Sequence, residues 1–367
     1  MRVVVIGGYG NFGARVCRGL AGSPGMEVVA AGRRPDQGRR DLDNPTLQHA
    51  RLDYSARDFP AQLKRLGPDL VIHCAGPFQS QDYRVALAAM AAGAHYLDLA
   101  DSRRFVARFA EMVHAAAHAA QRSAISGAST VPALSSAVIE SLRSRLAQVE
   151  EIQIVIAPGQ RAARGEATIA AVLSYSGRPF RWMSGGAWRD AWGWQELRRF
   201  RFEGLGARWA AACDVPDLEL LPKHYPEVRT VEFRAALELG VQHLALWLAS
   251  MLRRQGVPLP IERWAKPLNR IASWMNLFGG ARGGMFVGLV GRRPDGSRAR
   301  VEWHLTVDAE HGPEIPCMAA ILLAHKLAQG GIALRSASAC TGFLALREFE
   351  PQFARWRITT VLKENDA

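Results

Sequence analysis

The stretch that decides the fold is VVVIGGYGNFGARVCRGL, which runs from Val3 to Leu20. Its first residues are apolar and β-branched, and they predict a short, fully buried strand. Its second half spaces apolar residues at helical intervals with arginines between them, which predicts a helix. Between the two elements, Gly8, Gly10 and Gly13 fit the pattern G-x-G-x-x-G.

Each of these glycines has a distinct structural role in a strand–turn–helix unit. Gly8 permits the tight turn, Gly10 lets the backbone approach a pyrophosphate, and Gly13 lets the helix pack closely on the strand. The start of the helix then presents unpaired N–H groups and a partial positive charge to phosphates. Ordinary tight turns also collect glycines, but the strand before this turn and the helix after it indicate a dinucleotide site.

The end of the second predicted strand indicates which dinucleotide is bound. Residues 26–31 form that strand, and Gly32, Arg33 and Arg34 follow it about twenty residues after the glycine turn. NAD-selective sites place a carboxylate here, whereas a guanidinium can bind a 2′-phosphate through paired, charge-assisted hydrogen bonds. The two arginines therefore favour NADP(H), and the alternative is a solvated basic turn.

Composition excludes several classes of protein. The chain has 367 residues, which predicts two domains, and 49% of them are apolar, as in soluble globular proteins. The net charge of +12 is of the sign found in nucleic-acid-binding proteins, so this class has to be considered. No long basic run and no aromatic-interleaved motif occurs, so we expect no nucleic-acid partner and infer a preference for small anionic ligands.

The cysteines and the most apolar segment bear on compartment and membrane contact. The five cysteines lie far apart without a CxxC pair, so we expect neither a metal site nor a disulfide framework. The first strand begins at once, which leaves no room for a signal peptide and predicts a cytoplasmic protein. Residues 241–252 are too few to span a bilayer. They predict a buried helix, with an interface helix or a shallow peripheral membrane contact as alternatives.

Strands and helices alternate through the first part of the chain. Further strands are expected at 47–52, 69–75, 95–99 and 123–127, with helices between them. This alternation predicts an α/β fold with a Rossmann-like, doubly wound parallel sheet. Ligands bind outside the carboxyl ends of such strands. The residues expected to contact the cofactor are Gly8, Tyr9, Gly10, Asn11, Phe12, Gly13, Arg33, Arg34, Asp53, Ala75, Gly76, Pro77, Phe78 and Ser129.

Some of these residues have a second interpretation. Asp53 either reaches the adenine side of the cofactor or starts a turn. Phe78 is expected near the nicotinamide ring, and Ser129 either bonds the carboxamide or substrate or initiates a helix.

The second part of the chain differs in composition. Seven of the ten tryptophans lie between Trp182 and Trp264, among strand-like segments and prolines. The turn at 294–296 separates two of these segments and predicts a hairpin. We expect a second, α+β domain here, whose tryptophans either fill a core or wall an apolar pocket.

Several motifs together resemble the saccharopine dehydrogenase-like family of NADP-dependent reductases. They are GGYGNFG at 7–13, HCAGPF at 73–78, GAHYLDLAD at 93–101, GASTVPALS at 127–135, HGPEIPCMAAILLAHKLAQG at 311–330 and SASACTGFLAL at 336–346. The resemblance implies a Rossmann domain, a mixed-sheet domain, a catalytic cleft between them and C-terminal helices that return to the first domain. The chain has Pro132-Ala133 where the family often reads Pro-Gly, and it offers no clear residue set for a substrate with several carboxylates.

From these observations we divide the chain into three segments. Residues 1–131 form the NADP-binding domain, 132–310 the α+β substrate and dimerisation domain, and 311–367 a segment that returns toward the Rossmann domain. We expect a homodimer that acts on a small molecule.

Hydride transfer also needs a proton donor wherever negative charge develops. Asp98, Tyr96 and Asp101 lie at the carboxyl end of the fifth strand and are the candidates. Asp101 alternatively caps the following helix, and Asp98 alternatively holds the turn through backbone hydrogen bonds.

The resemblance narrows the chemistry to hydride transfer without naming a substrate. The first hypothesis is transfer to or from a C=N or CH–NH group of an amino-acid- or amine-derived substrate. The alternatives are an NADPH-dependent enoyl (C=C) reductase acting on a hydrophobic, lipid-like or polyketide-like chain, and a non-catalytic NADP-binding regulator.

Overall fold

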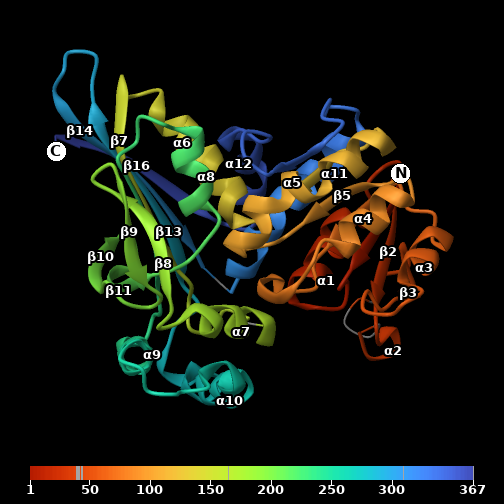
Figure 1. Cartoon of the computed structure of the whole chain (residues 1–367), viewed down its shortest axis with the longest axis horizontal. Coiled ribbons are helices and arrows are strands. Elements are labelled where there is room, and N and C mark those ends of the chain that lie inside the picture. The colour runs from red at the N-terminus through yellow and green to blue at the C-terminus, as the bar shows by residue number, and fades with distance from the viewer. Residues whose placement is uncertain (39–41, 43, 164, 309, 367) are drawn as a thin grey trace. The chain divides into compact units, whose positions relative to one another are not determined.

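The chain forms two compact units, which are distinguished in Figure 1 by their two large sheets. The computed structural model describes residues 1–366 with the exception of 39–41, 43, 164 and 309. The first unit consists of residues 1–134 and 314–344, and the second consists of residues 135–313 and 345–367.

The first unit is built on a seven-stranded sheet in which every paired neighbour is parallel. In spatial order its strands are β15 (Ala337–Ala339), β6 (Ala124–Ser126), β5 (His95–Asp98), β4 (Leu70–His73), β1 (Arg2–Ile6), β2 (Glu27–Gly32) and β3 (Leu47–Arg51). The strand order reverses between β1 and β4, which is the switch point at which such sheets bind ligands. The predicted Rossmann-like sheet is confirmed.

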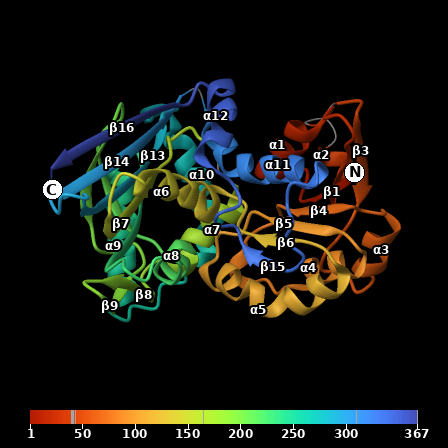
Figure 2. The ribbon, with the colours of Figure 1, turned by 90° about the horizontal axis from the view of Figure 1, so that it is seen from above.

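Helices cover both faces of this sheet (Figure 2). One face carries α1 (Asn11–Leu20), α2 (Pro35–Gly38) and α11 (Ile315–Ala328), and the other carries α3 (Phe59–Arg65), α4 (Arg84–Ala91) and α5 (Arg103–Ala120). Helix α1 packs against α11 so closely that a Cβ at Gly19 would lie 2.5 Å from Cδ1 of Ile321. The later part of the chain therefore contributes both a strand and a covering helix to the first unit.

The second unit contains a mixed seven-stranded sheet. Its order is β10 (Arg198–Phe202), β11 (Gly206–Ala212), β12 (Thr230–Ala236), β7 (Gln148–Ala157), β13 (Gly283–Arg292), β14 (Arg298–Val307) and β16 (Thr359–Asp366). Only the β12–β7 pair is parallel among the described pairs. The turn at 294–296 joins β13 to β14 as a hairpin. The expected α+β domain with a mixed sheet is confirmed.

Helices and a small hairpin complete the second unit. They are α6 (Ser135–Arg143), α7 (Glu166–Tyr175), β8 (Pro179–Ser184), β9 (Ala187–Trp192), α8 (Asp217–His224), α9 (Gly240–Arg254), α10 (Ala265–Trp274) and α12 (Leu346–Arg355). Some tryptophans of this unit are buried and others are exposed. Trp194 is buried and packs on His243, whereas Trp274 is 75% exposed.

Two expectations differ from the structure. Only residues 314–344 return to the first unit, because β16 in the remaining segment pairs with β14 of the second sheet. The interpretation of residues 241–252 as a buried helix is wrong, since Val241, Leu244 and Leu248 of α9 are exposed. Within the described residues, none of the helices combines the length and apolar character needed to cross a bilayer.

Candidate functional site

The turn between β1 and α1 is tight because the backbone packs on itself. The N–H groups of Gly7 and Gly8 both donate to the carbonyl oxygen of Ala31, at 2.9 and 3.1 Å. A Cβ at Gly13 would overlap the carbonyl oxygen of Gly7, and a Cβ at Gly8 would lie 3.0 Å from Cα of Ala30. The fold itself therefore requires glycine at positions 8 and 13.

Gly10 differs from both of these residues. Its backbone is extended, with φ −81° and ψ 172°, which any residue adopts. A Cβ at Gly10 would meet only the carbonyl oxygen of Gly7, at 3.2 Å. Gly10 is also the N-cap of α1, and no side chain among the described residues caps this helix. The turn thus places a glycine at a helix N-terminus that no described side chain caps, which suits a phosphate.

Asn11 and Phe12 begin α1 and are fixed by other parts of the first unit. Nη1 of Arg15 donates to both oxygens of Asn11, at 2.5 and 2.7 Å, and Nε of Arg15 forms an ion pair with Glu314 at 2.9 Å. The thiol of Cys317 donates to the carbonyl oxygen of Phe12 at 3.5 Å. The start of α1 is therefore held in place by the returning segment.

Tyr9 lies over the end of β2. Its hydroxyl donates to the carbonyl oxygen of Ala30 at 2.9 Å, and its ring stacks on His49 with centroids 5.8 Å apart. A Cβ at Gly32 would lie 2.8 Å from Cδ2 of Tyr9. A carboxylate side chain at position 32, as NAD-selective sites have, would therefore displace the Tyr9 ring.

The end of β2 and the end of β3 form the basic side of the site. Arg33 and Arg34 follow β2 and are exposed. Oδ1 of Asp53 accepts hydrogen bonds from the backbone N–H and the hydroxyl of Ser55, at 3.0 and 2.5 Å. These bonds lower the pKa of Asp53, and the positive charge of Arg33 adds to the effect. Asp53 thus starts a turn, and it lies near Arg33.

The loop after β4 adjoins the glycine turn. The Gly76–Pro77 peptide bond is cis, and a Cβ at Gly7 would lie 2.9 Å from Cβ of Ala75. Nε2 of Gln81 donates to the carbonyl oxygens of Ala75 and Pro77, at 2.7 and 3.0 Å. One side chain therefore fixes the shape of the loop at the switch point of the sheet.

His73, at the end of β4, contacts Gln81 and thereby helps to fix this loop. Burial lowers the pKa of His73 to about 4, so its ring is neutral at pH 7. Its Nε2 lies 2.8 Å from Oε1 of Gln81, and the acceptor there requires the proton on Nε2. The ring packs edge-on against Tyr54 and Phe78, with centroids 5.3 and 5.0 Å away. Phe78 is buried in this cluster.

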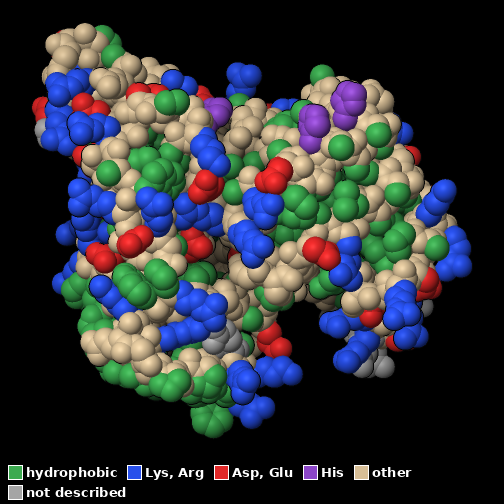
Figure 3. Space-filling model, viewed as in Figure 1, with side chains coloured by type: hydrophobic (Ala, Val, Ile, Leu, Met, Phe, Trp, Pro, Cys, Tyr) green, Lys and Arg blue, Asp and Glu red, His purple; other side chains and the backbone are tan. Residues whose placement is uncertain are grey.

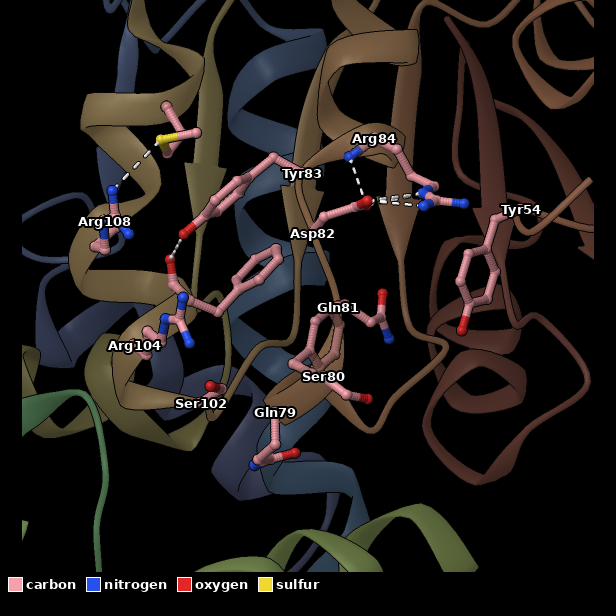
Figure 4. A pocket seen from close by; sticks show the side chains of 13 residues that line it. Tyr54, Gln79, Ser80, Gln81, Asp82, Tyr83, Arg84, Ser102, Arg104 and Arg108 are labelled. Atoms are coloured by element: carbon pink, nitrogen blue, oxygen red, sulfur yellow. Dashed lines mark hydrogen bonds and ion pairs between the residues drawn. The ribbon is translucent and has the colours of Figure 1, made fainter. Parts of the chain in front are cut away.

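A pocket of about 530 Å³ opens beside the loop (Figure 4). Its walls come from Tyr54, from residues 78–84 and from the outer side of α5. Three arginines line it, namely Arg84, Arg104 and Arg108, against one carboxylate, that of Asp82. Asp82 is bonded to Arg84, with O–N distances of 2.8–3.1 Å. The lining therefore favours a ligand with negative charge.

Asp98 and Tyr96 lie at the end of β5 and are completely buried. Oδ1 of Asp98 accepts from the N–H of Ala100 at 3.0 Å, the hydroxyl of Ser126 at 3.0 Å and the N–H of Gly127 at 2.8 Å. Burial nevertheless raises the pKa of Asp98 to about 6. Burial and the nearby Asp98 also raise the pKa of Tyr96 far above its ordinary value. These contacts are those of a residue that fixes the β6 loop.

Asp101 and Ser129 complete the predicted residues. Asp101 is half-buried, and its Oδ1 accepts from Nε2 of Gln79 at 3.1 Å. Ser102 occupies the N-cap of α5, so the alternative of Asp101 as that cap is wrong. Burial raises the pKa of Asp101. Ser129 is buried beyond β6, where its N–H donates to the carbonyl oxygen of Gly127 at 2.8 Å.

Sequence reasoning missed the residues that hold these loops. His49 supports Tyr9, and His73 with Gln81 fixes the loop after β4. His73 begins the HCAGPF motif and Gln81 lies within eight residues of it, whereas His49 acts on Tyr9, which is 40 residues away in sequence. The position of His73 at the end of β4, which borders the switch point, is a signal that favours it, whereas His49 lies on the edge strand β3.

The first domain matches a known family. Residues 3–131 match the family model described as the saccharopine dehydrogenase NADP binding domain. These residues belong to that family. The expected cofactor, NADP(H), is thereby confirmed for this NADP-binding domain. No curated protein matches the chain.

Solved structures extend the likeness to the whole chain. The apo histidine-tagged saccharopine dehydrogenase (L-Glu forming) from Saccharomyces cerevisiae is 12% identical, with a TM-score of 0.67 over 99% of both chains. The homospermidine synthase from Legionella pneumophila, solved in complex with NAD, is 8% identical, with a TM-score of 0.62 over 100% of this chain and 92% of that one. At these identities the likeness is one of fold.

Proposed function

We propose that this protein is an NADP(H)-dependent oxidoreductase that transfers a hydride to or from a C=N or CH–NH group of an amino-acid- or amine-derived substrate. The observation that carries this function is the N-terminus of α1 at Gly10, which no side chain among the described residues caps, in a domain of the saccharopine dehydrogenase NADP-binding family. The fold shared with the yeast saccharopine dehydrogenase supports the choice of C=N chemistry.

The residues at the carboxyl edge of the first sheet are suited to hold the cofactor. Backbone N–H groups at the start of α1 would bind the pyrophosphate, with Gly10 giving the close approach. Arg33 and Arg34 would bind the 2′-phosphate. The Tyr9 ring packs over Gly32 and leaves no room at position 32 for the carboxylate side chain that would repel this phosphate. The loop from Ala75 to Phe78 and the backbone around Ser129 would border the nicotinamide end. When bound, the nicotinamide supplies or accepts the hydride.

Among the candidate proton donors we favour Asp101. Asp98 and Tyr96 are completely buried, and Asp98 is engaged by three donors. Asp101 is only half-buried, and it bonds Gln79, a residue that lines the pocket. Its raised pKa keeps more of the carboxyl protonated than an ordinary aspartate would be. We assign Asp98 the role of positioning the β5 and β6 loops.

The pocket beside the loop is a place for the carboxylate of an amino-acid substrate. Arg104 and Arg108 lie one turn apart on α5 and both line it. Arg108 bonds Glu111 of the same helix, at 3.1 and 3.3 Å. We assign the substrate carboxylate to Arg104.

Two assays test this function. NADPH added to the protein should gain fluorescence on binding, and its absorbance should fall when pairs of 2-oxo acids and amines are supplied as imine precursors. The reverse reaction should reduce NADP⁺ in the presence of the corresponding secondary amines. NADPH that binds tightly but is not consumed with any pair in either direction would contradict the C=N assignment.

A second candidate is reduction of a C=C bond in a hydrophobic chain. It is favoured by the exposed apolar side chains of α9, among them Leu244 and Leu248, which suit a protein that works beside lipid. Consumption of NADPH with enoyl thioesters, but not with imines, would select it. Silence on both panels would select the non-catalytic NADP-binding regulator. The homodimer, the cytoplasmic location, the assignment of NADP binding to residues 1–131 and of substrate binding and dimerisation to residues 132–310, and the cleft between the domains stay predictions.

A further inference from the structure

Helix α9 turns its apolar side outward. Val241, Leu244 and Leu248 recur on one side of the helix, and all three are exposed. The residues that face inward include His243 and Ser250, which are completely buried. An amphipathic helix on a globular domain ordinarily has the opposite orientation. The outward side of α9 is therefore an apolar face without cover from the described part of the chain.

The same arrangement continues through α10 and the short 3₁₀ helix η5 (Met275–Phe278). Ile271, Trp274, Leu277 and Phe278 are 54%, 75%, 85% and 78% exposed. Figure 3 shows hydrophobic side chains gathered along the lower edge of the molecule, over α9 and α10, with lysine or arginine side chains beside them. We name this surface the α9–α10 patch and define it by Leu244, Leu248, Ile271, Trp274, Leu277 and Phe278.

Polar groups anchor the patch from its inner side. Nε2 of Gln160 donates to the carbonyl oxygen of Ala272 in α10 at 2.9 Å, and Nε2 of Gln195 donates to that of Trp247 in α9 at 3.0 Å. Nη1 of Arg253 donates to the carbonyl oxygen of Ser176 at 3.2 Å. These bonds fix both helices with their apolar sides outward, so the exposure is built into the packing of the second unit.

The charge of the segment selects the kind of partner. Residues 240–278 contain five arginine or lysine residues and one acidic residue. Arg254, Arg263, Lys266 and Arg270 are exposed. Exposed tryptophan, phenylalanine and leucine with surrounding cations is the pattern of a surface that inserts into the interface of an anionic bilayer. Two copies of the patch meeting face to face would bring like charges together, which disfavours self-association.

We propose that the α9–α10 patch docks the protein on a bilayer that contains anionic phospholipids. Trp274, Leu277 and Phe278 enter the boundary between headgroups and acyl chains, where their apolar surface leaves water. Lys266 and Arg270, on the same helix as Trp274, remain at the level of the lipid phosphates. The patch belongs to the second unit and contains none of the nucleotide-binding residues, so its docking does not depend on the reaction that the protein catalyses.

Vesicle binding tests this inference with the full-length protein. Vesicles of phosphatidylcholine with phosphatidylserine should bind the protein on flotation and shift its tryptophan fluorescence to shorter wavelength. The variant W274S/L277S/F278S should bind about tenfold more weakly or less. The variant K266E/R270E should lose binding to the phosphatidylserine vesicles, and added salt should weaken binding by the wild type. All five side chains are exposed, so both variants should fold, and the melting temperature checks this.

A matched variant and a measurement of mass complete the test. L87S/V361S/L362S removes three exposed apolar side chains outside the patch and should bind vesicles like the wild type. Equal binding by the wild type and W274S/L277S/F278S would overturn the inference, as would an absence of binding to phosphatidylserine vesicles. A lipid-free wild type that is a dimer by light scattering, with W274S/L277S/F278S a monomer, would also overturn it, because the patch would then join two copies. Unchanged vesicle binding by K266E/R270E would contradict the role of anionic lipid.

Discussion

The glycine turn after β1 and the loop after β5 lie at the same edge of one parallel sheet, yet their polar groups are used in opposite ways. At the turn, the backbone angles of Gly10 suit any residue, and a Cβ there would have one close neighbour in the chain, the carbonyl oxygen of Gly7 at 3.2 Å. At the loop, Asp98 is buried and accepts three hydrogen bonds from its own chain. The contrast separates two kinds of residue. A group satisfied within the fold holds the site together, and a group or space that the fold does not use is available to a ligand.

The largest expected effect is that of a substitution in the glycine turn. Gly10→Val should abolish measurable NADPH binding, because the branched side chain fills the space where the pyrophosphate approaches. The melting temperature should fall by a smaller margin than NADPH binding, since a Cβ at this position has one close neighbour in the chain, the carbonyl oxygen of Gly7 at 3.2 Å. NADPH fluorescence titration and thermal unfolding measure the two quantities.

Gly165→Val is the matched control. Gly165 is the N-cap of α7 in the second unit, with φ −77° and ψ 150°, close to the angles of Gly10, and a Cβ there meets nothing within 4 Å. This variant should bind NADPH like the wild type. Tight NADPH binding by Gly10→Val would remove the turn from the cofactor site.

The next effect concerns the choice between the two dinucleotides. The protein should prefer NADPH to NADH by a factor of roughly ten to a thousand, because a lost charge-assisted phosphate contact costs about 1.5–3 kcal/mol. Arg33→Ala should weaken NADPH binding far more than NADH binding, as titration of both cofactors would measure. Equal losses for the two cofactors would show that Arg33 does not contact the 2′-phosphate.

The role of Asp98 in the loop after β5 can be tested through the pH dependence of the protein's stability. Burial raises its pKa from the ordinary 3.8 to about 6, so the folded protein binds this proton more tightly than the unfolded chain does. Its contribution to stability is therefore present below about pH 4 and lost as the pH rises through 6, by roughly 2–3 kcal/mol. Asp98→Asn removes this dependence. Compared with the variant, the wild type should lose stability between pH 4 and pH 7 in denaturant titrations.

Asp53→Asn is a control of opposite sign. Hydrogen bonds from Ser55 lower the pKa of Asp53, so its contribution is present at neutral pH and lost on acidification. A stability difference between the wild type and Asp98→Asn that does not vary with pH would contradict the raised pKa of the buried Asp98 carboxyl. Lost turnover in Asp98→Asn with unchanged stability and NADPH affinity would instead make Asp98 the proton donor.

The smallest expected effect distinguishes two arginines of the pocket. Arg104→Ala should raise KM for an amino-acid substrate by about five- to tenfold with little change in kcat, as for the loss of an exposed charge contact made equally in ground and transition states. Arg108→Ala should have a smaller effect, because Arg108 already bonds Glu111. Steady-state kinetics on both variants would decide, and equal KM values in Arg104→Ala and wild type would exclude Arg104 from substrate binding.

The parts of the fold that the sequence predicted correctly are those encoded locally. The β1 strand, the glycine turn and α1 follow one another within twenty residues, and each has its own periodicity or steric signal. The alternation of strands and helices extends the same logic through β6 and predicts the edge at which the site lies.

The parts that escaped prediction depend on contacts between distant residues. Gly32 is close to Arg33 in sequence, but the reason for its glycine is the ring of Tyr9 from another loop. Helix α9 has a clear apolar side, and periodicity correctly identifies the helix. The side that faces the core depends on inward hydrogen bonds such as that from Gln195 to Trp247, so periodicity alone assigned it wrongly.

The return of residues 314–344 to the first unit has a consequence for how the protein is made. Strand β15 pairs with β6, and α11 covers α1, so the nucleotide-binding unit lacks an edge strand and a covering helix until these segments leave the ribosome. By then residues 135–313 have already emerged. The unit that begins first during translation is therefore completed only after most of the second unit has emerged, and until then its unpaired β6 edge and bare α1 surface are exposed on the nascent chain.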